Sequence, residues 1–430
     1  CVHNSIKKVY YINYIILIIK LNRLVLKSFK FFIIFLLSLI FVSQGFTKPL
    51  NKNWSKVIKS GMNKSLNFHA WGGSENINSY IKWVGKEVKK KYGIKLNHIK
   101  IKDTAQAVKK VLYEKISGKN KQGSVDMIWI NGENFSSMLK NNLLYNKNWI
   151  FELPNSKYIN LSKNSSLMFD FGIYTQGKEM PWGLSQLIFF YDSNKLKKVP
   201  RDVFEFKEYI IRNKGRITFP QPPDFVGTSF LKQILSELIL DKDVLQEKFD
   251  KRNHKIILAK LWKWLDEVTP FLWKRGKYYP KNYLALTQLL ADDEIDISMA
   301  FNISFPSNEV MKGNLPSSII SYVPIAGSLS NVHYLSIPYN ASNPSSAKLV
   351  INFMISKEAQ LRKNSQEIWG DPTVLNYKKL GNKWQKKFES LSKGSATISF
   401  KDLEKKISEP HPSWVKKIEK ERIKKYGSVN

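Results

Sequence analysis

The chain has almost no cysteine: Cys1 is the only one among 430 residues. An intrachain disulfide and a cysteine-based metal site are therefore both excluded. The histidines form neither an HExxH pattern nor a pair at helical spacing, so zinc chemistry has no local support. They are His3, His69, His98, His254, His333 and His411. No phosphate-binding loop of the Walker type occurs either. The sequence predicts no metal and no cofactor, and it leaves any ATP hydrolysis to another chain.

Acidic residues are also scarce, since 69 lysines and arginines stand against 35 aspartates and glutamates and give a formal charge of +34. The lysines are spread over the whole chain instead of being gathered in one segment. A nucleic-acid-binding protein usually concentrates its basic residues on one face or along one helix. We therefore interpret the excess as solvated lysine on the surface and expect no nucleic-acid partner.

Apolar residues, in contrast, are plentiful. The hydrophobic fraction of 43% and the aromatic fraction of 13% are typical of a globular chain with a substantial core. The length allows two domains or one large bilobed domain.

The N-terminal segment has the order of a secretory signal peptide. Lys27 and Lys30 precede a mainly apolar run at 31–42, and small residues follow at 43–45. The run is short of the roughly 20 residues that span a bilayer. We interpret residues 1–45 as an upstream extension plus a signal peptide, with a signal anchor that stays in the membrane as the alternative. No cysteine follows the run, so we expect a soluble, exported, periplasmic protein that is not a lipoprotein.

Short β-prone runs alternate with helical patterns in the first third of the chain. Strands are predicted at 65–70, 94–101 and 125–130, each followed by a helix. The second of these helices is expected to bury Val108, Leu112 and Ile116. This alternation favours a parallel sheet with helices on its faces.

Two loops at the ends of predicted strands combine glycine with an aromatic or polar side chain. They read Trp71-Gly72-Gly73 and Asn131-Gly132-Glu133. Ligands of parallel sheets bind at the carboxyl ends of the strands, where glycine permits close approach and helix N-termini offer N–H groups. The alternative is that Gly72-Gly73 and Asn131-Gly132 each only form a tight turn.

A third helix start is predicted in the middle of the chain. A strand is expected at 216–220, and Thr228 and Ser229 are expected to cap a helix over 230–240. This would be another N-terminus that tolerates an anion, with an ordinary helix cap as the alternative.

Further elements are predicted from residue 241 onward. The aromatic residues of 241–290 follow helical spacing and indicate core packing. Strands are expected at 295–301, which ends at Asn302, and at 322–326. The remaining predicted elements are a strand at 332–338, a helix from Ala347, a second helix behind Ser356, and charged surface helices over 380–430.

Several sequence motifs of the chain resemble those of the bacterial extracellular solute-binding proteins of ABC importers. In chain order the segments are Trp71-Gly72-Gly73, Asn131-Gly132-Glu133-Asn134, Pro181-Trp182-Gly183, Gly227-Thr228-Ser229, Ser298-Met299-Ala300-Phe301-Asn302 and Ile337-Pro338-Tyr339-Asn340-Ala341. The resemblance is to family 1 of these proteins, and it is nearest to the YnjB-type subfamily. It implies an α/β, two-lobed type II periplasmic-binding-protein fold, with mainly parallel sheets flanked by helices and joined by crossover hinge strands. Lobe 1 would comprise 64–182, lobe 2 would comprise 183–326, and 327–430 would return to lobe 1 with C-terminal helices.

The resemblance also implies a site between the lobes. The first-lobe wall would contain Trp71, Gly72, Gly73, Asn131 and Glu133. The hinge would contain Trp182 and Gly183, and the opposite wall Thr228, Ser229, Phe301 and Asn302. Three helix N-termini in this site favour an anionic solute, whereas Glu133 could hold a cationic group.

The implied function is capture of a small solute and its delivery to a membrane permease by hinge closure. The partners would be the solute, the importer permease and, through it, an ATPase subunit, with the protein itself a monomer that meets the membrane only through the permease. An enzyme on the same fold is one alternative, but the sequence from Gly183 to Leu187 misses the nucleophile elbow at its last position. A sensory binding protein that docks on a receptor is the other alternative.

Overall fold

The computed structural model describes residues 52–398 and 400–427, so the predicted signal peptide at 1–45 lies outside the described residues. The chain divides into two compact units between Ser55 and Lys56, a division that helix α2 (Lys52–Gly61) crosses. The fold below is that of the second unit. Within the described ranges, no helix is both long and apolar enough to cross a membrane.

The first lobe is built on a sheet of six strands in the order β11-β10-β3-β1-β2, with β6 also pairing with β10. Strands β1 (Ser65–Trp71), β2 (Lys95–Ile101) and β3 (Met127–Ile130) are parallel, as the alternating pattern predicted. Their carboxyl ends therefore lie along one edge of the sheet.

The helices that follow these strands are α3 (Glu75–Tyr92), α4 (Thr104–Ile116) and α5 (Gly132–Lys140). Helix α4 buries a face rotated from the predicted one: Ala107, Val108 and Val111 are buried, whereas Ile116 is 73% exposed. The face is rotated because Val111 packs into the same cluster as Ile128 and Ile130 of β3.

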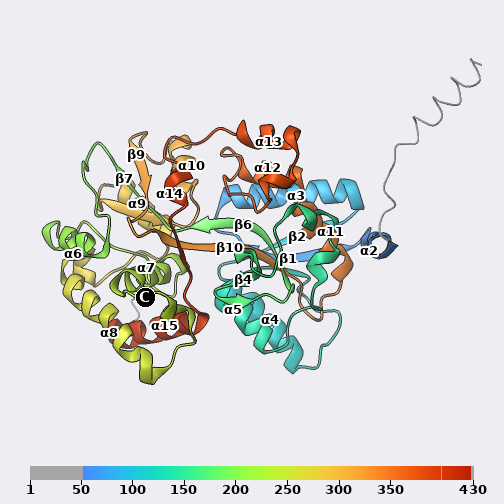
Figure 1. Ribbon diagram of the computed structural model, residues 1–430, viewed down its shortest axis with the longest axis horizontal. Helices are drawn as coiled ribbons and strands as arrows, with labels where there is room; N and C mark the ends of the chain where they lie inside the picture. Colours follow the sequence, from blue (N-terminus) through green and yellow to red (C-terminus); the bar gives the residue numbers. More distant parts are fainter. Residues whose placement is uncertain (1–51, 399, 428–430) are drawn as a thin grey trace, which may run out of the picture. The chain divides into compact units, whose positions relative to one another are not determined.

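Two antiparallel strands connect the lobes, β6 (Glu179–Gln186) and β10 (Ser328–Ser336). Figure 1 shows them side by side, with β6 in green and β10 in orange. The end of β10 pairs with β3 in the first lobe, and its beginning pairs with β11 (Lys406–Ser408).

The second lobe has a three-stranded sheet in the order β8-β7-β9. The strands are β7 (Ile188–Asp192), β8 (Ile297–Ala300) and β9 (Ile319–Tyr322), and both pairings are antiparallel, which corrects the expectation of a mainly parallel sheet. No helix separates β7 from β6, so β7 enters the sheet directly from the crossover strand, and the two strands beside it run the other way.

Helices surround this second sheet. They are α6 (Val203–Arg212), α7 (Phe225–Leu238), α8 (Lys251–Val268), α9 (Tyr283–Ala291) and α10 (Phe305–Met311). The aromatic residues of α8 are core, as predicted, since Trp262 and Trp264 are both buried in the large cluster of this lobe.

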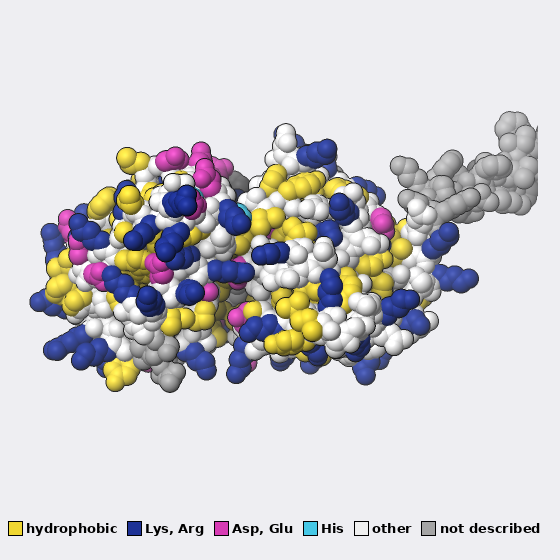
Figure 2. Space-filling view, turned by 90° about the horizontal axis from the view of Figure 1, so that it is seen from below, with side chains coloured by type: hydrophobic (Ala, Val, Ile, Leu, Met, Phe, Trp, Pro, Cys, Tyr) yellow, Lys and Arg dark blue, Asp and Glu magenta, His cyan; other side chains and the backbone are white. Residues whose placement is uncertain are grey.

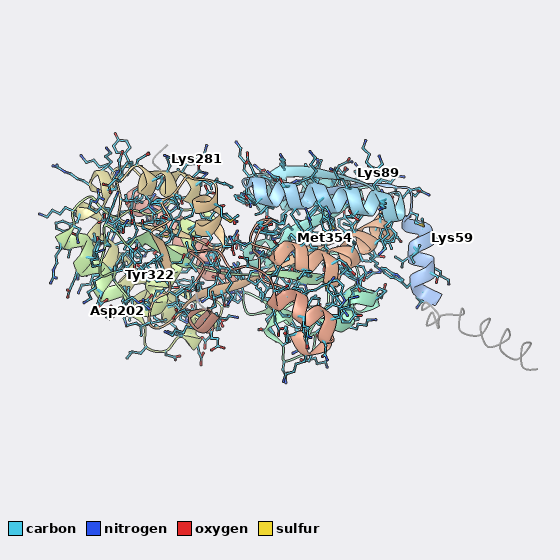
Figure 3. All side chains as sticks on the ribbon, turned by 90° about the horizontal axis from the view of Figure 1, so that it is seen from above. Lys59, Lys89, Asp202, Lys281, Tyr322 and Met354 are labelled. Atoms are coloured by element: carbon cyan, nitrogen blue, oxygen red, sulfur yellow. The ribbon has the colours of Figure 1, made fainter. Side chains whose placement is uncertain are left out.

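Two strand predictions in this lobe were wrong. Residues 216–220 are not a strand, because their carbonyls accept single bonds from the Asp296 and Trp273 N–H groups instead of a ladder. The strand expected at 322–326 is β9, which ends at Tyr322. Figure 3 labels Tyr322 in this lobe and Met354 of α11 in the first lobe.

The C-terminal part begins in the first lobe with α11 (Pro344–Met354), α12 (Lys357–Asn364) and α13 (Asn382–Glu389). Ser356 caps α12 by accepting the Ala359 N–H at 3.2 Å, as predicted. Helix α14 (Phe400–Leu403) and α15 (Pro412–Tyr426) follow. Helix α15 had been grouped with lobe 1 as a surface helix, but Trp414 and Ile418 are buried in the core cluster of the second lobe.

Shorter elements complete the described chain. They are the strands β4 (Phe169–Asp170) and β5 (Ile173–Tyr174) and the 3-10 helices at Trp149–Glu152, Pro154–Tyr158, Ser166–Met168, Asp243–Gln246, Thr269–Phe271, Trp273–Gly276 and Tyr377–Lys379. Lysine and arginine side chains are scattered over the face shown in Figure 2, as expected for solvated surface charge.

Candidate functional site

The candidate site is the junction between the two lobes, where the carboxyl ends of β1, β2 and β3 face the second lobe. Trp71 ends β1, Asp103 follows β2 and Asn131 follows β3. Because the three strands are parallel, these residues lie along one edge of the sheet.

Trp71 reaches across the junction. Its ring lies 6.1 Å from the ring of Tyr283, the first residue of α9 in the second lobe. Gly73 is packed against the Trp71 indole so closely that a Cβ there would overlap the ring. Gly72 donates its N–H to Ile101 O at 3.1 Å, so this amide is already used within the sheet edge. Trp71 is the member of this loop that can present a face to a ligand.

The loop after β3 is shaped by a buried carboxylate. Asp170 accepts the Gly132 N–H at 2.6 Å, and burial raises the pKa of Asp170 well above its ordinary value. Asn131 precedes α5 and makes no side-chain cap, so its amide is not committed to the helix end. Glu133 lies in the first turn of α5, half-buried, and accepts the Asn134 amide at 3.2 Å.

The predicted cap of α7 was wrong. The helix begins at Phe225, and the Asp224 carboxylate accepts the N–H groups of Val226 at 2.9 Å and Gly227 at 3.0 Å. Thr228 and Ser229 are therefore buried inside the helix. An acidic side chain already occupies this helix N-terminus, so it offers no support for an anionic solute.

Thr228 nevertheless contributes to the junction. Its hydroxyl donates to Glu419 Oε1 of α15 at 2.9 Å. Phe301 is 8% exposed and lies 4.9 Å from the Phe225 ring. Asn302 is half-buried, and its Oδ1 accepts the Ser304 N–H at 3.0 Å. Ser229 is fully buried.

Trp182 and Gly183 lie on the crossover strand β6, as predicted, but inside a packed cluster. The Trp182 ring is 0% exposed and lies 5.1 Å from Trp129 and 5.4 Å from Trp369. Gly183 faces the Asp371 carboxylate, which is buried and paired with Lys363 and, at 3.1 Å, with His333 Nε2. These residues set the packing of the hinge, and Trp182 has no exposed surface for a ligand.

The loop beside this cluster ties the hinge to the second lobe. Ser304 Oγ donates to Gly370 O at 2.9 Å, and the Asn308 amide donates to Trp369 O at 3.1 Å. A change in the relative orientation of the lobes would therefore alter the packing of the aromatic cluster of Trp129, Trp182 and Trp369.

A buried ion pair marks the other end of the junction. Lys232 of α7 donates to Glu409 Oε2 at 2.5 Å, and the two side chains are 1% and 2% exposed. The Lys232 ammonium also lies 4.9 Å from the centre of the Phe171 ring, which belongs to the first lobe, and 5.6 Å from Phe225. Lys232 thus connects the lobes through its charge.

Sequence reasoning missed several of these residues. Asp103 was not singled out from the sequence as a site residue; it caps α4 by accepting the Ala105 N–H at 2.8 Å. Glu409 and Glu419 lie within ordinary polar sequence and carried no signal, whereas Lys232 is a single lysine within the mainly apolar helix α7. Among the residues described here, no group of three or more histidines, cysteines, aspartates or glutamates is placed to hold a metal ion.

Comparison with known proteins relates this geometry to a family. The model of a family described as bacterial extracellular solute-binding protein matches residues 83–389. The chain is similar to protein YnjB of Escherichia coli strain K12, with 36% identity over 376 residues, which are 87% of this chain and 94% of that protein.

Two solved structures share the fold. One is the periplasmic binding protein AfuA of Actinobacillus pleuropneumoniae with fructose-6-phosphate bound (15% identity, TM-score 0.59, 85% of this chain and 99% of that chain covered). The other is a putative spermidine/putrescine ABC transporter protein of Listeria monocytogenes (16% identity, TM-score 0.59, 84% and 98% covered). The solutes named for these two proteins differ in charge, so the shared fold does not specify a ligand.

Proposed function

The chain belongs to the family of bacterial extracellular solute-binding proteins, and from that premise we propose that it is the solute-binding component of an ABC importer. It captures a small solute at the junction between its lobes and presents it to a membrane permease. The permease works with a separate ATPase subunit, and the binding protein acts in the periplasm as a monomer.

One observation carries the choice of site. The contact of Trp71, at the carboxyl end of β1, with Tyr283 at the start of α9 lies on one side of the junction, with 6.1 Å between the ring centres. The Lys232–Phe171 contact at 4.9 Å lies on the other. Aromatic faces give shape and exclude water, and amide or carboxylate groups between them give direction. We assign Trp71, Asn131, Glu133 and Phe301 to the solute, whereas Thr228 is buried inside α7 and acts through its hydrogen bond to Glu419.

Closure of the lobes links binding to recognition. A solute that contacts both lobes favours the state in which they lie together, so the permease can distinguish loaded from empty protein. Trp182 and Gly183 serve this step through the packing of the hinge and do not touch the solute. Gly72 and Gly73 act by allowing the close approach of Lys100 and Trp71.

A thermal-shift screen against a broad library of small solutes tests the proposal. A solute at about 100 times its dissociation constant should add roughly 2.7 kcal/mol of stability. The variants Trp71→Ala and Asn131→Ala should bind the best solute at least about ten times more weakly. The control is Tyr113→Ala, because Tyr113 is 66% exposed on α4.

Unchanged affinity in both site variants would refute the site. A solute that is converted to product during incubation would indicate an enzyme instead.

A further inference from the structure

The lysines of the first lobe are less evenly distributed than the sequence suggests. Residues 56–102 contain eleven lysines and no arginine, and the acids of this segment are Glu75 and Glu87. The segment runs from within α2 through β1 and α3 to the end of β2. It is therefore far more basic than the chain as a whole, in which basic residues outnumber acidic ones 69 to 35.

The fold gathers six of these lysines at one end of the lobe, where α2 and α3 end beside the amino ends of β1 and β2. The Asn63 N–H donates to Tyr92 O at 3.0 Å, and the Lys95 N–H donates to Lys64 O at 2.9 Å. Ser65 and Lys95 are partners where the two strands begin side by side. The lysines within a few residues of these contacts are called the distal patch: Lys59, Lys64, Lys89, Lys90, Lys91 and Lys95.

The distal patch lies at the end of the first lobe that is farthest from the candidate site. Helix α3 starts behind the Trp71 loop, at the carboxyl end of β1, and its 18 residues give it a length of about 27 Å. Its last turn, which carries three lysines of the patch, is therefore well removed from the junction. Figure 3 labels Lys59 and Lys89 on the side of the first lobe that faces away from Asp202 and Tyr322 of the second lobe.

The positive charge of the patch is not balanced by ion pairs. All six lysines are exposed, and no acidic side chain of the described residues pairs with any of them. The Lys91 ammonium lies 5.6 Å from the centre of the Tyr92 ring. A nearby acid is turned inward, because Asp126 is 2% exposed and accepts the N–H groups of Asn67 and Asn343, both at 2.9 Å.

Exposed and unpaired lysines attract polyanions, and the chemistry of this patch favours lipid over nucleic acid. The patch has no arginine, the residue that grips phosphates and bases bidentately. The Tyr92 ring beside it is half-buried under Lys91 and is not free to stack on a base. The family is extracellular, and the described part of the chain has no helix that could cross a membrane. A surface contact with headgroups is the membrane binding that such a patch allows.

We propose that the distal patch binds the anionic headgroups of a lipid bilayer. This contact is electrostatic and reversible, and it goes beyond both the proposed function and the membrane contact through the permease that the sequence predicts. A bilayer at this end of the lobe leaves the junction open to solute and keeps the protein near the membrane in which a permease lies. Each lysine close to an anionic bilayer contributes about fivefold to the affinity.

Co-sedimentation with lipid vesicles tests the proposal. The protein used is the chain from residue 46 onward, which contains the whole compact unit 56–430 and lacks the apolar run at 31–42 that could itself bind lipid. It should bind vesicles of equal parts phosphatidylglycerol and phosphatidylcholine, and it should not bind vesicles of phosphatidylcholine alone. Binding should be lost between about 0.1 M and about 1 M salt, because the Debye length falls from about 10 Å to about 3 Å.

Two triple variants each remove three charges from the distal patch, and a third removes three charges from exposed positions of α8 in the second lobe. They are Lys89→Gln with Lys90→Gln and Lys91→Gln, Lys59→Gln with Lys64→Gln and Lys95→Gln, and, as the control, Lys251→Gln with Lys255→Gln and Lys260→Gln. Both patch variants should bind the charged vesicles at least about tenfold more weakly, whereas the control should stay within about twofold. Thermal unfolding checks that each variant folds. The two patch variants change different elements, so misfolding of one leaves the other as the test.

The remaining outcomes all count against the proposal. Absence of binding to the charged vesicles overturns it, and so does equal binding to both kinds of vesicle. Equal losses in the patch and control variants would mean that only the total charge matters, which overturns the assignment to the distal patch. Tighter binding to a short DNA duplex than to the charged vesicles at the same salt concentration overturns the choice of partner. The proposed function is tested separately by the solute screen.

Discussion

The buried pair Lys232–Glu409 allows a sharp test of the junction, because replacing either member leaves the other charge unpaired and the two unpaired charges differ in how easily they are neutralised. Both side chains are almost fully buried, at 1% and 2% exposure. Glu409→Gln would leave an ammonium without a counter-charge. Lys232→Met would leave a carboxylate whose pKa burial already raises, so that it can take up a proton.

The cost of each change is bounded by the free energy of neutralising the stranded group. From ordinary pKa values, that bound at pH 7 is about 4.6 kcal/mol for the lysine and about 3.7 kcal/mol for the glutamate. At pH 5 the bound for the glutamate falls to about 1 kcal/mol, since little work is then needed to protonate it. The bound for the lysine does not fall.

Urea unfolding at pH 7 and pH 5 measures both costs. The deficit of Lys232→Met should shrink strongly on acidification, whereas that of Glu409→Gln should persist. The double variant should cost less than the two single variants together. Lys312→Met is the matched control, because Lys312 is 39% exposed in its pair with Glu309 and should change stability by less than about 1 kcal/mol.

Two results would refute this reasoning. Single-variant deficits below about 1 kcal/mol would mean that the pair is not desolvated. An equal response of both variants to pH would mean that Glu409 cannot be neutralised where the structure places it.

Two further predictions concern the hinge and the pH response. Gly183→Ala should destabilise the protein by about 1–3 kcal/mol in urea unfolding, because a Cβ there would clash with Asp371 and lie 2.8 Å from His333 Cδ2; a neutral result would contradict the hinge packing. The raised pKa of Glu419, about 7, means that the folded protein keeps a proton that the unfolded chain releases, so stability should fall as pH rises from about 4.5 to 7. Glu419→Gln should reduce this pH-dependent change in the free energy of unfolding by up to about 3 kcal/mol. Parallel pH profiles of the two proteins would exclude the assignment of the raised pKa to Glu419.

Much of the first lobe was predictable because its signals are local. The strand–helix alternation of residues 65–140 predicted parallel strands, and β1, β2 and β3 are parallel. The sequence motifs and their order along the chain predicted the family and the two-lobed fold. Local signals were less reliable where several residues compete for one role: Asp224, and not Thr228 or Ser229, caps α7.

The second lobe was predicted less well because its partners are distant in the chain. Residues 216–220 have the composition of a strand, but single bonds from residues far along the chain take the place of a ladder. Helix α15 is rich in lysine and was predicted to lie on the surface, yet Trp414 and Ile418 are buried in the second lobe. Composition shows that a helix has an apolar stripe and does not show which lobe that stripe will cover.

The sequence by itself determined the family, the α/β alternation and the positions of the loops that end the parallel strands, because periodicity and turn chemistry act over a few residues. Only the tertiary structure decided the chemistry of the junction. Lys232 meets Glu409 across 177 positions, and Thr228 meets Glu419 across 191. Contacts of this kind depend on how the C-terminal segment returns over the second lobe, and long-range packing of side chains leaves no periodic trace in the sequence.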